Sequence, residues 1–238
     1  NKFRSIALRA AKVNTFIVGV GVKSQTVKVE AKDDDDMDPT GQNFVLGDTM
    51  EEKRYDDHEV KQAKAVLRFN LRTLGPDHVQ MITGFSELGN LYEKKKRLAE
   101  ALKYHQKALD IAIGKFGEEH IMASQIIADI GSIHLREGRY DKALECFNKC
   151  LDIRLKILEH DHPNIATTYG FIGAVLYKQG KLEEALENYM KSLAIKLLRL
   201  GPNHIDLATT YNNIGLIYMA KDMDDKALDS YKKSLAIY

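Results

Sequence analysis

The chain has 238 residues, of which 44% are hydrophobic and 29% charged, and its formal net charge is +1. This composition is typical of a folded globular protein, and the near-neutral charge argues against a dedicated nucleic-acid binder, whose surface usually carries a large basic excess. The longest apolar run, Phe16 to Val22, is interrupted by glycine and is too short to span a bilayer. Two cysteines are too few for a disulfide framework, so we expect a reducing compartment.

An N-terminal arm and linker are expected over residues 1–40. Residues 1–29 contain no acidic side chain, and a short helix there would place Lys2 and Arg9 on one side and Ile6 on the other. Such a segment can contact a partner, lie on a membrane surface, or be the remnant of a transit sequence.

An acidic run, 33–38, follows the basic segment. A calcium-binding loop starting at Asp36 would have Gly41 at its sixth position but Gly47 at its twelfth, where a bidentate glutamate is required. The loop lacks its most important ligand, so a solvated linker is the better interpretation.

The remainder of the chain carries an internal repeat of 42 residues. Each unit has a histidine ahead of a first helical segment, a glycine within that segment, and an alanine near the start of a second segment. The glycine costs about 1 kcal/mol relative to alanine in a helix. Its recurrence predicts a close backbone approach, with the alanine as the facing surface. The repeated residues are His78, His120, His162 and His204, then Gly89, Gly131, Gly173 and Gly215, then Ala101, Ala143, Ala185 and Ala227.

Helix pairs are therefore expected, with each repeated histidine fixing the start of a first helix. One pair cannot bury its apolar face alone, so successive pairs stack and share a continuous core. The last pair keeps the internal pattern to its end, so we expect another helix, another repeat or a partner subunit to cover it. The predicted pairs are 75–116, 117–158, 159–200 and 201–238, with a degenerate pair at 41–74.

The order of Leu-Gly, Tyr, Ala-Leu, an aromatic residue and a second Ala-Leu resembles the tetratricopeptide repeat. The longer unit, with Leu-Gly-Pro-Asn/Asp-His between repeats and Ala-Thr-Thr-Tyr-Asn-Asn-Ile-Gly at 208–215, is similar to the kinesin light chain and nephrocystin-3 type. Over residues 41–238 the resemblance implies an all-α, right-handed solenoid. It also implies a concave groove, lined by the first helices, where members bind peptides or helices of protein partners.

The expected location is the cytoplasm, with an association with the cytoskeleton left open. An organelle interior is the alternative if residues 1–29 derive from a targeting region.

In the family the groove is reached from positions six, three and two residues before the repeated glycine, and one and five after it. The inner positions here lack lysine and arginine, so a clamp for a terminal carboxylate is not expected. Lys94, Arg136 and Lys178 form either a basic row along one rim or solvated helix ends. The candidate groove residues are Thr83, Glu87, Asn90, Lys94, Gln125, Asp129, Ser132, Arg136, Thr167, Phe171, Lys178, Thr209, Asn212, Asn213 and Leu216.

No catalytic residue, metal site or cofactor is predicted. The sequence has no nucleophile elbow, glycine-rich phosphate loop or zinc motif. The four repeated histidines would lie roughly 20 Å apart in stacked helix pairs, against ~2 Å for a metal–nitrogen bond. His160 with His162, and Cys146 with Cys150, are weaker candidates, and Cys150 fits a small packed position.

The predicted function is a non-enzymatic scaffold or adaptor that binds a peptide or helix of a partner protein in its groove. The alternative is a structural or assembly subunit of a large complex, anchored through the N-terminal arm. An enzyme that carries this array as a module would need further sequence.

Overall fold

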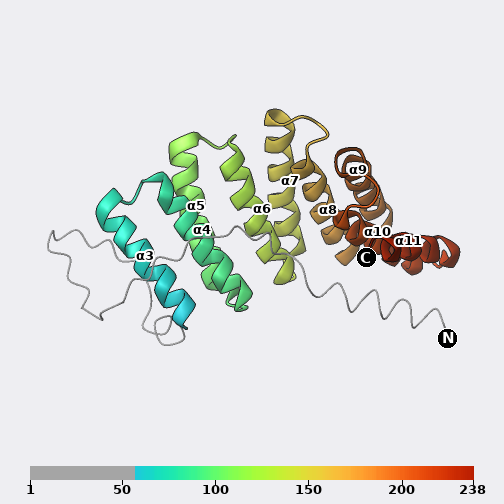
Figure 1. Cartoon of the computed structure of the whole chain (residues 1–238), viewed down its shortest axis with the longest axis horizontal. Coiled ribbons are helices and arrows are strands. Elements are labelled where there is room, and N and C mark those ends of the chain that lie inside the picture. Colours follow the sequence, from blue (N-terminus) through green and yellow to red (C-terminus); the bar gives the residue numbers. More distant parts are fainter. Residues whose placement is uncertain (1–56) are drawn as a thin grey trace. The chain divides into compact units, whose positions relative to one another are not determined.

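The computed structural model describes residues 57–238, and every regular element in this part of the chain is an α-helix (Figure 1). The all-α prediction is confirmed. The N-terminal arm, the acidic run and the first part of the degenerate pair lie outside the described residues. The helices are α3 (His58–Leu74), α4 (Val79–Lys94), α5 (Leu98–Phe116), α6 (Ile121–Arg136), α7 (Tyr140–Ile157), α8 (Pro163–Lys178), α9 (Leu182–Leu200), α10 (Ile205–Ala220) and α11 (Asp224–Ile237).

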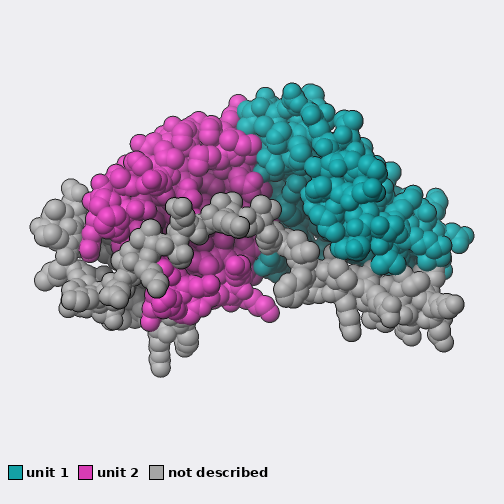
Figure 2. All heavy atoms as spheres, in the orientation of Figure 1, with its two compact units in different colours: residues 1–22, 134–238 teal, residues 23–133 magenta. Residues whose placement is uncertain are grey.

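Within the series α3 to α5, and within the series α7 to α11, each helix packs against the next. The pairs α4–α5, α8–α9 and α10–α11 share the most extensive contacts, while α3 packs on α4, α7 on α8, and α9 on α10. By their contacts the described residues fall into two compact units, 57–133 and 134–238 (Figure 2). Each unit is described by itself below.

Histidine caps the first helix of each strong repeat. In all four, the imidazole Nδ1 accepts a hydrogen bond from the backbone N–H two residues later, at 3.1 to 3.3 Å. This bond satisfies one of the N–H groups that a helix leaves unpaired at its start, a role more often filled by serine, threonine, aspartate or asparagine. The predicted role of the repeated histidines is confirmed. The pairs are Gln80 with His78, Met122 with His120, Asn164 with His162, and Asp206 with His204.

The repeated glycine does mark a close approach, but the facing group is an aromatic ring. A Cβ on Gly89 would lie 2.7 Å from the imidazole of His105, and one on Gly215 would lie 2.7 Å from Cε1 of Tyr231. The corresponding contact of Gly173 is with the ring of Tyr189, at 3.1 Å. The prediction that the repeated alanine faces the glycine is therefore wrong at these three positions. The ring lies one helical turn beyond the alanine on the second helix, and its flat face needs the bare backbone.

A buried cation joins neighbouring pairs within the unit 134–238. Arg154 of α7 is 2% exposed, and its Nη1 donates to the carbonyl of Asn164 at 2.9 Å and to Oγ1 of Thr168 at 2.8 Å. Lys196 of α9 has the same arrangement one repeat later, and donates to the Asp206 carbonyl at 3.3 Å and to Thr210 at 3.0 Å. Both cations therefore tie a second helix to the first turns of the next first helix.

Removing the Arg154 side chain is expected to destabilise the protein. Arg154→Ala would leave the Thr168 hydroxyl and the Asn164 carbonyl without a charged donor, at a cost of about 2 kcal/mol in the free energy of unfolding. Arg154→Lys should retain most of this stability, because Lys196 makes the same contacts with an ammonium. Urea denaturation followed by circular dichroism measures both variants, and equal losses would contradict the assignment.

Cys150 lies in the same layer and is fully buried, with its Sγ 3.8 Å from Oγ1 of Thr168. Its prediction as a small packed residue is confirmed. Both cysteines are free thiols, and burial is the main cause that raises the pKa of the half-buried Cys146.

The end of α11 exposes apolar side chains that match the repeat. Leu235 is 67% exposed, whereas Leu193, its counterpart one repeat earlier, is 7% exposed beneath neighbouring helices. The expectation that a further helix or partner covers α11 stays a prediction.

Candidate functional site

The candidate groove residues of the unit 134–238 come from α8 and α10, which contact each other. Thr167 and Thr209 are exposed at equivalent positions, and Asn213 is half-buried. Phe171 is also half-buried, because its ring stacks on Phe147 of α7 with centroids 5.0 Å apart. Leu216 is half-buried too, so this face combines hydroxyl and amide groups with apolar side chains.

Asn212 differs from its neighbour Asn213. It is 4% exposed, and neither its amide nitrogen nor its amide oxygen has a hydrogen-bond partner among the described residues. An unpaired buried amide destabilises the free protein. Of the predicted asparagine pair, only Asn213 is partly accessible among the described residues.

The candidates of the unit 57–133 come from α4 and α6. Thr83, Glu87 and Asn90 are exposed on α4. On α6 the amide of Gln125 donates to the carboxylate of Asp129 at 3.1 Å. The hydroxyl of Ser132 donates to the Ala128 carbonyl at 3.1 Å, which leaves that oxygen able to accept a further bond.

The three cations of the predicted basic row are all exposed, and each lies in the last turn of its own helix. A cation in this place interacts favourably with the carboxyl end of the helix by about 0.3–1 kcal/mol. Lys94, Arg136 and Lys178 therefore have a local structural role, which they can fill with or without a bound partner.

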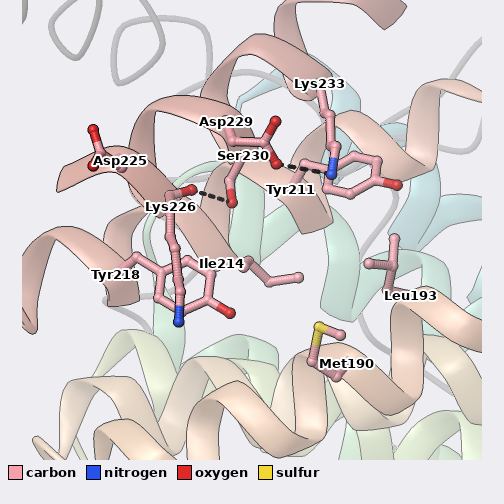
Figure 3. A pocket seen from close by; sticks show the side chains of 10 residues that line it. All are labelled: Met190, Leu193, Tyr211, Ile214, Tyr218, Asp225, Lys226, Asp229, Ser230 and Lys233. Carbon is pink, nitrogen blue, oxygen red and sulfur yellow. Dashed lines mark hydrogen bonds and ion pairs between the residues drawn. The ribbon is translucent and has the colours of Figure 1, made fainter. Parts of the chain in front are cut away.

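Apart from the candidate groove residues, a recess lies in the unit 134–238, between α9, α10 and α11 (Figure 3). It is an open cleft of about 400 Å³, and the sequence analysis named none of its residues. One signal was available: Met190 stands where the other repeats have Gln106, Asn148 and Lys232. The cleft is lined by Met190, Leu193, Tyr211, Ile214, Tyr218, Asp225, Lys226, Asp229, Ser230 and Lys233.

Neither a metal site nor a membrane span is found in the part of the chain that the structure describes. Within residues 57–238 no three histidine, cysteine, aspartate or glutamate side chains gather as a metal site would need. None of the helices in this range combines the length and the apolar character required to cross a bilayer.

A comparison with family models identifies the repeat. The model described as tetratricopeptide repeat matches residues 80–156, 120–197 and 166–238, which together span more than half of the chain. The chain belongs to the tetratricopeptide repeat family. Domains of this family generally mediate protein–protein interactions and are typically non-catalytic, so a protein partner is indicated.

Solved structures of other tetratricopeptide repeat proteins share the fold. BtubC (BKLC) from P. vanneervenii superposes with a TM-score of 0.67 at 21% identity, over 76% of this chain and 73% of that one. A kinesin light chain-like protein of Podospora anserina with nearly identical TPR-like repeats gives 0.62 at 19% identity, over 75% and 84%. The apo form of RapI gives 0.65 at 20% identity, over 79% and 66%.

These neighbours confirm the predicted repeat type, because kinesin light chain-like proteins are among them. Identities of 19 to 21% establish the fold alone. No curated protein matches the chain.

Proposed function

We propose that the chain is a non-enzymatic adaptor that binds a peptide or helix of another protein on the first helices of its repeats. The proposal rests on family membership together with the exposed face of α8 and α10. Both helices use their other faces to pack, α8 against α7 and α9, and α10 against α9 and α11. On the candidate face Thr167, Thr209 and Lys178 are exposed among the described residues, and Phe171, Asn213 and Leu216 are half-buried.

The chemistry of this face suits a polypeptide ligand. Asn213 can donate to and accept from a peptide backbone, and the threonine hydroxyls can do the same. Phe171 and Leu216 add apolar surface beside these polar groups. Within this set Lys178 carries the only charge, so we expect apolar burial and backbone hydrogen bonds to contribute more than ion pairs, which give at most about 1 kcal/mol each when exposed.

Placing two charges on this face is expected to weaken partner binding at least tenfold, or by about 1.4 kcal/mol. Thr209→Arg combined with Asn213→Arg puts bulky cations where a partner backbone would lie. The amount of each co-purifying protein is measured by affinity capture with quantitative mass spectrometry, and the dissociation constant is then measured with the purified partner.

Asn203→Arg is the matched control, because Asn203 is exposed in the turn before α10 and outside the candidate face. The control should bind as the unaltered protein does. If the double variant keeps its partner while deletion of 1–38 abolishes association, the groove proposal is wrong and the assembly subunit anchored by its N-terminal arm is favoured.

A further inference from the structure

The first strong repeat contains a complete three-ring stack. Tyr104 of α5 lies between two rings of α4, with its centroid 6.2 Å from that of Phe85 and 5.4 Å from that of Tyr92. The interplanar angles are 22° and 4°. All three side chains are buried, so the middle ring fills the space between the outer two.

The last repeat has the outer rings of this stack and lacks the middle one. Tyr211 and Tyr218 of α10 stand at the positions of Phe85 and Tyr92, three repeats later, but the position of Tyr104 is taken by Ser230. The Ser230 hydroxyl donates to the backbone carbonyl of Lys226 at 2.8 Å, so it does not reach across the gap. The cleft of about 400 Å³ lies where the third ring would be (Figure 3).

One cation of the stack, Lys107, has a counterpart at the cleft, whereas Lys103 is replaced there by Asp229. In the first strong repeat the Lys107 ammonium lies 5.6 Å from the Phe85 centroid and 5.8 Å from that of Tyr104. Lys233 stands at the same position and lies 5.9 Å from the Tyr211 centroid, so its ammonium borders the empty place. An ammonium attracts the negative face of an aromatic ring. Lys233 is also paired with Asp229 at 2.8 Å, and Asp225 lines the cleft too, so the Lys233 ammonium can face a ring while its charge is balanced by a carboxylate.

The opposite wall of the cleft is apolar. Met190 of α9 lines it and is 48% exposed, next to the buried Leu193 (Figure 3). A thioether makes favourable contacts with aromatic rings and adapts its shape to them. Lys226 also lines the cleft, beside Asp225 and Asp229, and its ammonium lies 5.6 Å from the Tyr218 centroid.

We propose that this cleft binds an aromatic side chain carried by a segment of a partner protein. The inserted ring would stack between Tyr211 and Tyr218 as Tyr104 stacks in the first strong repeat. In the first strong repeat the equivalent space is filled by a polypeptide side chain, that of Tyr104. The cleft volume is within the range of about 300–1,000 Å³ for ligand sites. No candidate groove residue lines the cleft, so this site does not depend on the proposed α8–α10 face.

The test follows the Met190 methyl group by NMR in the full chain labelled with methyl-¹³C methionine. The probe is the peptide acetyl-Gly-Tyr-Gly-amide, with acetyl-Gly-Leu-Gly-amide as its matched control. The tyrosine peptide should shift the Met190 resonance saturably through its ring current, and the leucine peptide should bind at least threefold more weakly. Met190→Leu assigns the resonance.

Ser230→Tyr should abolish the response, because the chain then supplies the middle ring itself, and Ser230→Ala should retain it. If Ser230→Tyr does not fold, Tyr218→Ala replaces it and should weaken peptide binding at least tenfold by removing one of the two stacking rings. An absent shift, or an equal response in the filling and control variants, overturns the proposal.

Two other occupants are distinguished by the same measurement. p-Cresol, the tyrosine side chain without a backbone, should bind at least threefold more weakly than the tyrosine peptide. Equal or tighter binding would mark the cleft as a site for small aromatic molecules and overturn the partner segment. A Met190 shift that depends on protein concentration without peptide would identify a second copy of this chain as the occupant, with the same consequence.

Discussion

Replacing His105 with phenylalanine is expected to stabilise the unit 57–133 and to remove much of its sensitivity to mild acid. The imidazole is fully buried against Gly89, and neither ring nitrogen has a hydrogen-bond partner among the described residues. Burial lowers its pKa from 6.5 to about 4. Phe147 stands at the equivalent position of the next repeat and is fully buried, which indicates that a phenyl ring suits this position.

The direction of the pH dependence follows from this lowered pKa. The unfolded chain binds a proton at His105 near pH 6.5, whereas the folded chain resists the proton until about pH 4. Protonation therefore favours the unfolded state, and stability that is present above pH 6.5 is lost as the pH falls toward 4. At about 1.4 kcal/mol per pKa unit, the total loss is about 3 kcal/mol.

The measurement compares urea denaturation of the two proteins at pH 7.5, 6 and 5. At pH 7.5 His105→Phe should be more stable by about 1–2 kcal/mol, because it removes an unpaired buried polar group. The difference should widen as the pH falls. His58→Phe is the control, since His58 is exposed at the start of α3 and its replacement should leave the pH dependence unchanged. Parallel pH profiles for His105→Phe and the unaltered protein would contradict the prediction.

The repeat made much of the fold predictable from sequence. A period of 42 residues identifies equivalent positions without any knowledge of their neighbours, so the helix pairs and the capping histidines could be predicted directly. The same period could not say which residue faces which. Glycine and alanine both suggested close packing, and the ring that lies against the glycine became visible only in the structure.

The contacts of long charged side chains between helix pairs were also missed by the sequence analysis. Arg154 and Lys196 are charged residues for which exposure to solvent is the usual expectation, yet both reach the next helix pair. Their partners, Thr168 and Thr210, follow the same period as the cations. The paired recurrence of a cation and a threonine was therefore the available signal, but single residues read one at a time do not reveal it.

The helix positions of the candidate site residues could be predicted from the sequence, but the exposure of their side chains could be predicted only in part. Spacing from the repeated glycine predicted Thr167, Thr209 and Asn213 on a face that solvent reaches, as the structure shows. The same spacing also predicted Asn212 there, but its side chain is buried. The cleft beside α11 could not be predicted in this way. It results from a small residue, Ser230, at a position where Tyr104 fills the earlier repeat, and its volume depends on how three helices pack.

Gly215→Ala is expected to destabilise the unit 134–238 by about 3 kcal/mol, the upper end of the usual range for overpacking. The added methyl group would lie 2.7 Å from Cε1, 2.9 Å from Cδ1 and 3.0 Å from Cζ of Tyr231. That ring is 3% exposed and has little space into which it can move. The helix-propensity gain of about 1 kcal/mol from replacing glycine is too small to offset the clash.

Two further glycines make this prediction a graded series under thermal and urea denaturation. Gly173→Ala should cost less than Gly215→Ala, because its nearest ring atom lies at 3.1 Å and a small shift of Tyr189 relieves the contact. Gly114→Ala should instead stabilise by roughly 0.5–1 kcal/mol, since Gly114 is an exposed glycine inside α5 with no atom within 4 Å of its added Cβ. If all three substitutions stabilised the protein, helix propensity alone would govern these positions and the ring contact would not constrain the fold. The opposite signs expected for Gly114 and Gly215 separate the intrinsic preference of a helix for alanine from the requirement that two helices approach through a bare backbone.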